Sequence, residues 1–216
     1  MTLEQLNKLY ARIADELDIS DALYERAVAS YEAVGTYIGN HTSYNVNIYT
    51  QGSFRLGTVI RPLNDEDDYD LDLVCEFEDG QGLSAETLKR EVGAILENSK
   101  RYSNNLIEKN RCWRIDYADE AQFHMDITPA VAEIHSGSMI FVTDRNKNLD
   151  YSYIPSNPKG YDEWFSSQNI VTQKSVFEKG MVYDAADIEP VKKHGSKTPL
   201  QKAIQIIKRH RDMMFT

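Results

Sequence analysis

Apolar residues recur at two different spacings along this chain, and each spacing predicts one type of element. A spacing of three or four positions, typical of helices with one apolar face, is found in four segments: residues 2–17, 22–38, 84–96 and 198–216. Ser20, Ser84 and Thr198 precede helical residues as N-caps do, and Pro199 suits a first helical position. We therefore predict four long helices, the first two of which serve as scaffold.

Strict alternation of apolar and polar residues predicts β-strands that bury one face. It is found in residues 44–49, 69–77, 111–117 and 122–129, and the apolar residues 139–142 predict another short strand. Residues 118–120 read as a turn, so the third and fourth strands are expected to form a hairpin. Residues 143–158 are polar and turn-rich, and residues 160–166 predict a short helix. Strands and helices in this order indicate an α+β fold with a mixed or antiparallel sheet flanked by helices.

The strand at residues 69–77 has a pair of neighbouring aspartates near the start of its polar face. Because successive side chains point to opposite faces, Asp70 and Asp72 lie together while Leu71 and Leu73 point into the core. Neighbouring carboxylates suit Mg²⁺, which prefers hard oxygen ligands. Taken alone, however, Asp-x-Asp is more often the solvated end of an acidic loop, here residues 64–68.

Gly52 and Ser53 follow the strand predicted at residues 44–49. Ser53 could cap a short helix over residues 54–56, and the free N–H groups of a helix start suit a phosphate. Gly52 would allow that phosphate to approach the backbone. An ordinary turn is the alternative, and the sequence lacks the Gly-Lys-Ser/Thr of a P-loop.

A third carboxylate comes from the predicted hairpin. Alternation in residues 122–129 places His124, Asp126 and Thr128 on the polar side. Asp116, on the other strand of the hairpin, is the rival for the same role. We prefer Asp126, because the Ile-Thr-Pro-Ala that follows it ends the strand just beyond.

These residues carry a resemblance to a known superfamily. Gly52-Ser53, then Asp70-Leu71-Asp72, then Asp126 before Ile-Thr-Pro-Ala, resembles the DNA polymerase β-type nucleotidyltransferases. The longer strings QGSFRLGT, DYDLDLV, SNPKGYDEWF and TPLQKAIQIIKRHRD are similar to the bacterial cGAS/DncV-like branch (CD-NTases, or SMODS nucleotidyltransferases), the cyclic oligonucleotide synthases of CBASS antiphage systems. The resemblance extends to Phe215.

The resemblance implies a two-metal phosphoryl transfer on NTPs, ATP among them. Asp70, Asp72 and Asp126 would be catalytic and would hold two Mg²⁺ ions, for which Mn²⁺ could substitute. The residues expected to bind the nucleotide triphosphate are Gln51, Gly52, Ser53 and Lys208. The product would be a cyclic di- or trinucleotide that acts on a downstream effector, with regulatory proteins of the same operon as further partners.

An aromatic segment and the basic last helix each allow two interpretations. Tyr161, Trp164 and Phe165 could stack on a nucleobase, although such a cluster is more often core. The last helix is expected to turn an apolar stripe inward, formed by Leu200, Ala203, Ile204 and Ile207. Its basic residues suit a solvated face, except that Ile-Ile-Lys at Lys208 resembles the triphosphate lysine of related synthases.

Composition narrows the class of substrate. The chain has 34 acidic against 24 basic residues, a formal net charge of -10, which argues against a long DNA or RNA footprint. Metal ions could still neutralise a free nucleotide locally. The mean hydropathy of -0.53 predicts a soluble protein, and Cys75 and Cys112 lack metal-ligand spacing and suit reduced packing positions. With no signal-like start and no apolar segment of about 20 residues, a cytoplasmic location without membrane contact is expected.

Two alternatives to the synthase remain open. One is a nucleotidyltransferase that modifies RNA or protein, as in toxin–antitoxin systems, and the other is a non-catalytic nucleotide-binding scaffold. Three clustered acids repel one another unless cations are present, which favours an active site over the scaffold. We expect residues 1–197 to form the nucleotidyltransferase core and residues 198–216 the first helix of a C-terminal helical domain, the rest of which the sequence lacks.

Overall fold

The computed structural model describes residues 1–64, 68–117, 123–133, 135, 137–168, 176–177, 182–183, 186–193, 195 and 197–215. The turn predicted at residues 118–120 and the centre of the acidic run at residues 64–68 lie outside the described residues. No helix in the described ranges is both long and apolar enough to cross a membrane.

Helices and strands alternate in the order expected of an α+β domain. The helices are α1 (Leu3–Glu16), α2 (Asp21–His41), α3 (Gly52–Leu56), α4 (Ala85–Glu97), a 3-10 turn (Ser103–Asn105), α5 (Pro158–Ser167) and α6 (Pro199–Met214). The strands are β1 (Val46–Thr50), β2 (Tyr69–Phe77), β3 (Leu106–Glu108), β4 (Trp113–Asp116), β5 (Phe123–Ala132), β6 (Ile140–Arg145), β7 (Tyr151–Ser156), β8 (Val176–Phe177), β9 (Val182–Tyr183), β10 (Ala186–Ile188) and β11 (Lys192–Lys193).

Most of the strands form one mixed sheet in the order β3-β4-β5-β2-β1-β10-β9, and β5 also pairs with β6, which pairs with β7. Strands β2 and β5 run parallel, and so do β1 and β10, whereas the other pairs in this sheet are antiparallel. The predicted mixed α+β class and the β4–β5 hairpin are confirmed. The parallel β2–β5 pair is central to the site, because it fixes which polar residues stand side by side.

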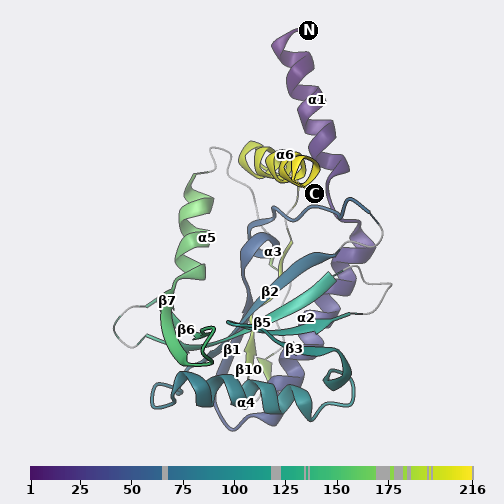
Figure 1. Ribbon diagram of the computed structural model, residues 1–216. Coiled ribbons are helices and arrows are strands. Elements are labelled where there is room, and N and C mark those ends of the chain that lie inside the picture. The colour runs from purple at the N-terminus through teal and green to yellow at the C-terminus, as the bar shows by residue number, and fades with distance from the viewer. Residues whose placement is uncertain are drawn as a thin grey trace.

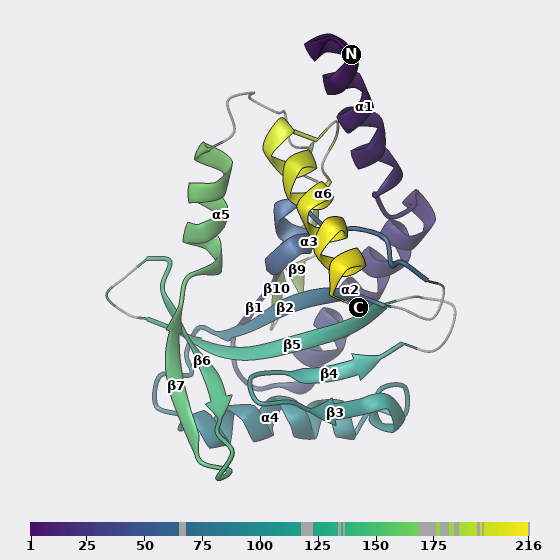
Figure 2. The same ribbon diagram turned by 45° about the horizontal axis from the view of Figure 1, so that its top comes forward.

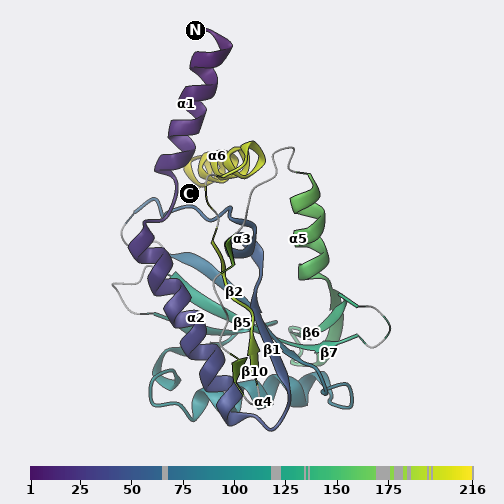
Figure 3. The same ribbon diagram turned by 180° about the vertical axis from the view of Figure 1, so that it is seen from behind.

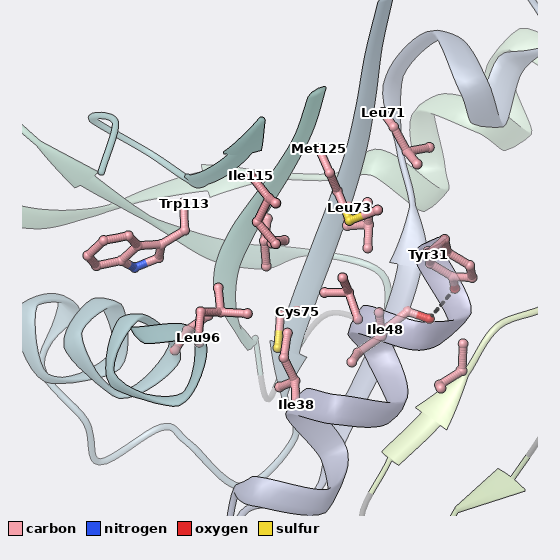
Figure 4. Close-up of a cluster of buried hydrophobic side chains, with 14 of the residues drawn as sticks. Tyr31, Ile38, Ile48, Leu71, Leu73, Cys75, Leu96, Trp113, Ile115 and Met125 are labelled. Carbon is pink, nitrogen blue, oxygen red and sulfur yellow. Dashed lines mark hydrogen bonds between the residues drawn. The ribbon is translucent and has the colours of Figure 1, made fainter. Parts of the chain in front are cut away.

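Helices α2 and α4 cover one face of the sheet (Figures 1 and 3). Leu71, Leu73 and Cys75 of β2 point into this layer, where they pack in one cluster with Tyr31 of α2 and Leu96 of α4 (Figure 4). Their burial sends the alternate residues of β2 to the opposite face. The core therefore orients the two aspartates of β2 toward the side that carries α3 and α6.

A buried lysine ties α4 to the turn before β4. The Nζ of Lys89, a side chain with no solvent exposure, donates to the carbonyls of Lys109, Asn110 and Cys112 at 3.0, 3.2 and 3.1 Å. Burial lowers the pKa of Lys89 to about 8. This contact fixes the start of β4, which supplies a residue of the site described below.

Replacing Lys89 by methionine should destabilise the fold by about 2 kcal/mol, because three backbone carbonyls lose their lysine donor. Urea unfolding of wild type and variant measures this difference. Lys100→Met, at an exposed position near the end of the same helix, is the control and should change stability little. Equal stability of the two variants would contradict the role given to Lys89.

Three sequence predictions are wrong. Residues 143–158 are not a loop but contain most of the β6–β7 hairpin. In α5 only Phe165 is core among the three aromatic residues, whereas Tyr161 and Trp164 are more than half exposed. The inward stripe of α6 is the third error.

Helix α1 forms as predicted, but part of its apolar stripe is exposed, with Tyr10 at 48% and Ile13 at 38%. Figure 1 shows α1 projecting from the rest of the molecule.

The buried face of α6 is polar. Gln201 and Gln205 are buried, whereas Ala203 and Ile207 are exposed. The Nε2 atoms of the two glutamines donate to the carbonyls of Leu56 and Val59, both at 2.8 Å. A ladder of side-chain amides thus holds α6 against the segment that follows α3. Hydrogen bonding to this backbone, rather than burial of apolar area, decides which face points inward.

Candidate active site

Five polar side chains meet on the exposed face of three adjacent strands. The parallel register of β2 and β5 pairs Asp70 with His124 and Asp72 with Asp126. The antiparallel register of β4 and β5 pairs Arg114 with Asp126. All five lie on one face because each strand contributes alternate positions. The three predicted carboxylates are therefore brought together, and two basic side chains stand among them.

Arg114 binds both carboxylate oxygens of Asp126 with one edge of its guanidinium group. Its Nε lies 2.7 Å from Asp126 Oδ1 and its Nη2 lies 2.8 Å from Oδ2. The same Nη2 is 3.6 Å from Asp70 Oδ1. Such a paired contact fixes the orientation of a carboxylate as well as balancing its charge. Each oxygen of Asp126 keeps a second lone pair for another ligand.

His124 and Asp70 form the second close pair in the cluster. The Nε2 of His124 hydrogen-bonds Asp70 Oδ1, and this hydrogen bond holds the pKa of the Asp70 carboxyl below its usual value. It also raises the pKa of His124. The Asp70 side chain is 57% exposed and that of His124 only 15%, so Asp70 is the partner with room to turn.

Asp72 is half-buried, unlike the exposed Asp70. Burial, followed by the charges of Asp70 and Asp126, raises its pKa to about 7. Its backbone carbonyl accepts a hydrogen bond from the N–H of Gln51 at 2.8 Å. An added Cβ on Gly52 would lie 2.4 Å from Asp72 Oδ2. The Gly-Ser turn therefore packs directly against this carboxylate.

The turn differs in one detail from the sequence prediction. Ser53 is not the N-cap of α3: the helix begins at Gly52, Gln51 takes the N-cap position, and no side chain caps it. Gly52 has a φ of 61°, in the left-handed region where glycine alone is unstrained. The Gln51 side chain reaches Thr128 of β5, with Nε2 3.4 Å from Oγ1, so it links the turn to the strand of Asp126.

An open pocket lies between the Gly-Ser turn, Asp70 and helix α6. Ser53, Asp70 and Lys208 all line it, together with residues 59–63. Lys208 Nζ donates to the Thr58 carbonyl at 3.1 Å, and burial and the charge of Arg211 lower its pKa. Figure 2 shows α6 crossing near α3 and β2. The lysine that the sequence singled out thus shares a pocket with the serine and one aspartate.

The donor set suits divalent cations. Three carboxylates offer hard oxygen ligands, and ligand atoms of Asp70, His124 and Asp126 lie within 4.8 Å of one another. The raised pKa of Asp72 reflects repulsion from the other two acids as well as burial. A bound cation would relieve both effects, because it favours the ionised form. The residues present therefore fit the metal expected from the sequence.

Sequence reasoning missed Arg114 and assigned His124 no role. Both lie at alternate positions on the polar faces of predicted strands. This position was the one feature of the sequence that could have identified them as site residues. Their partners follow from strand order and register, which a single sequence does not display. The rival carboxylate Asp116 pairs in register with His124, so it stands one strand farther from Asp70.

Comparison with known proteins gives a consistent picture. Residues 1–169 match the family model described as the Second Messenger Oligonucleotide or Dinucleotide Synthetase domain (SMODS). The chain is 27% identical over 217 residues to a c-di-GMP synthase of Roseivirga ehrenbergii. It is 28% identical over 233 residues to the cyclic dinucleotide synthase CdnG of Bradyrhizobium diazoefficiens.

The fold has a similar counterpart among solved structures. The CD-NTase CdnG of Bradyrhizobium diazoefficiens, in complex with GTP, matches 98% of this chain with a TM-score of 0.73 and 24% identity. Each of the two curated relatives also matches 98% of the chain. The chain spans 55% and 54% of those relatives and 65% of the solved chain.

Proposed function

This chain belongs to the Second Messenger Oligonucleotide or Dinucleotide Synthetase family, and we propose that the protein joins nucleoside triphosphates into a cyclic oligonucleotide. One observation carries the proposal: the β2–β5 register aligns Asp72 with Asp126, beside a pocket lined by Ser53, Asp70 and Lys208. Because the relatives include a c-di-GMP synthase and a structure with bound GTP, GTP is the first substrate to test, and ATP the second.

The position of the pocket suggests which acids face the triphosphate and which faces the attacking hydroxyl. We assign Asp70 and Asp72 to the triphosphate of the bound nucleotide, because Asp70 lies in the pocket with Ser53 and Lys208. Asp126, one strand farther, is assigned to the side of the attacking ribose hydroxyl. Divalent cations held by the three carboxylates, Mg²⁺ in the first instance, would neutralise the phosphates and acidify that hydroxyl.

The protein's own side chains contribute position and charge. Ser53 and the backbone of the Gly-Ser turn offer donors to phosphate oxygens, and Gln51 anchors the turn to β5. Lys208 supplies a single positive charge that offsets the repulsion between the phosphates and the carboxylates. Attack on the α-phosphate forms a new phosphodiester bond and releases pyrophosphate, and a second such step closes the ring.

Lys208→Gln tests the assignment of the triphosphate. The glutamine amide can still donate to the Thr58 carbonyl, so the change removes the charge and leaves the local contact possible. We expect the KM for NTP to rise about 10-fold, equivalent to ~1.4 kcal/mol, with a smaller change in kcat. Lys202→Gln is the matched control, because Lys202 lies on the same helix and pairs with Asp15. Equal KM values for the two variants would contradict the assignment.

The proposed activity is tested with protein expressed from its complete gene. Purified protein is incubated with α-³²P-labelled GTP or ATP and Mg²⁺ or Mn²⁺, and the products are treated with phosphatase. A phosphatase-resistant product with the mass of a cyclic nucleotide supports the proposal. Label on added RNA or protein would instead support the modifying enzyme, and bound but unconverted nucleotide would support the scaffold.

The proposal extends to a cellular role through the family resemblance. We assign the product to signalling in antiphage defence, in the cytoplasm, with an effector that binds the cyclic nucleotide and with regulatory proteins encoded in the same operon. A phage challenge of cells with the wild-type gene or with Asp72→Asn tests this role. Equal plaque counts on the two strains would contradict it.

A further inference from the structure

His124 stands inside the acidic cluster but differs in chemistry from the three aspartates. It is the register partner of Asp70 across β2 and β5, and it lies two residues before Asp126 on the same face. One of its ring nitrogens and one oxygen each of Asp70 and Asp126 lie within 4.8 Å of one another. In octahedral coordination at about 2.1 Å, adjacent ligand atoms are roughly 3.0 Å apart and opposite ones roughly 4.2 Å apart. Small side-chain rotations would therefore bring these three atoms onto one ion.

The surroundings of His124 would allow its ring to leave Asp70 and bind a metal ion. Its imidazole is 15% exposed, whereas the Asp70 carboxylate bonded to it is 57% exposed. Asp70 therefore has room to turn while the mostly buried ring stays in place. Arg114 already engages both oxygens of Asp126, which leaves that carboxylate one lone pair per oxygen for a metal. A neutral imidazole would complete the ligand set without adding a fourth negative charge to the cluster.

We propose that His124 is a nitrogen ligand of the divalent cation held by Asp70 and Asp126, and that it makes the site favour Mn²⁺ over Mg²⁺. This rests on the metal site of the proposed function and adds one ligand to it. Mg²⁺ prefers oxygen ligands alone, whereas transition-metal ions bind mixed imidazole and carboxylate sets more tightly. Binding requires the neutral imidazole with its Nε2 released from Asp70.

The test uses Mn²⁺ alone, without nucleotide. Mn²⁺ is added to the purified protein and examined by electron spin echo spectroscopy, which detects ¹⁴N nuclei bound to the ion. We expect ¹⁴N modulation in the wild type, replaced by a ¹⁵N pattern when only histidine is labelled with ¹⁵N. His124→Gln should abolish the modulation and weaken Mn²⁺ binding about 10-fold, while changing Mg²⁺ binding less than about 2-fold.

Asp116→Asn is the matched control, because Asp116 is the neighbour of His124 on β4 and lies outside the ligand group. It should keep the nitrogen signal. Mn²⁺ bound by the wild type without ¹⁴N modulation would overturn the role of His124 and leave the carboxylate site standing. Equal Mn²⁺ binding by the wild type and Asp72→Asn, or none by the wild type, would count against the proposed metal site as well.

Discussion

Asp72→Asn is expected to lower cyclic nucleotide synthesis at least ~1,000-fold, equivalent to about 4 kcal/mol of activation free energy. Asparagine keeps the size of the side chain but removes the charge that would hold a cation between the triphosphate and Asp126. Because Asp72 is the central acid, aligned with Asp126 and one alternate position from Asp70, no other carboxylate of the cluster can replace it. Product formed per minute from labelled GTP measures the loss.

The same change should stabilise the metal-free fold. In the folded protein the pKa of Asp72 is raised from 3.8 to about 7, so the folded state binds the proton more tightly than the unfolded state. The wild type therefore loses stability as the pH rises from about 4 to about 7, and the variant does not. Since one pH unit between the two pKa values corresponds to about 1.4 kcal/mol, we expect a gain on the order of 4 kcal/mol at pH 8.

Urea unfolding in EDTA at several pH values between 4 and 8 measures this gain. The difference between variant and wild type should be small near pH 4 and should level off above pH 7. An inactive variant that is also more stable separates a functional carboxylate from a structural one. Asp116→Asn provides the comparison, and it should leave both activity and pH dependence unchanged. Loss of activity there, with retention in Asp126→Asn, would reverse the choice between the two acids.

Local pattern was sufficient to find the acids and the elements that carry them. Alternation in residues 69–77 placed Asp70 and Asp72 opposite the core residues Leu71 and Leu73, and the burial of these leucines agrees. Asp126 followed from the same rule applied to the hairpin. Such inferences succeed because the period of a strand is set by its own backbone. The catalytic roles of the three acids remain predictions.

The rest of the site depends on contacts between distant segments. Pairing of Asp70 with His124 follows from the register of two strands far apart in sequence, and a one-residue slip would turn every side chain over. Helix α6 shows a second kind of failure, in which the element was predicted correctly but its buried face was not. Its apolar stripe was read correctly as a helical pattern, but the backbone carbonyls of residues 56–59 attract Gln201 and Gln205 instead. The periodicity of a sequence does not reveal which backbone carbonyls of another segment need a hydrogen-bond donor.

The Gly-Ser turn supplies the second large effect, because Gly52 faces Asp72 without a side chain between them. An alanine there meets two penalties. The φ of 61° costs a residue with a Cβ about 1–2 kcal/mol, and the new Cβ would lie 2.4 Å from Asp72 Oδ2. To relieve that contact the carboxylate must turn away or the turn must move, and either shift changes the position of Asp72 relative to the Gly-Ser turn.

Gly52→Ala is therefore expected to lower activity about 100-fold while lowering stability by only about 1–2 kcal/mol. Kinetic assays and urea unfolding measure the two effects separately. Gly82→Ala is the control, since a Cβ at Gly82 would meet no atom within 4 Å, and it should retain full activity. Adding Gly52→Ala to Asp72→Asn should cause little further loss, because both changes act on the same carboxylate. If the two losses multiplied instead, Gly52 would act on the phosphate itself and not through Asp72.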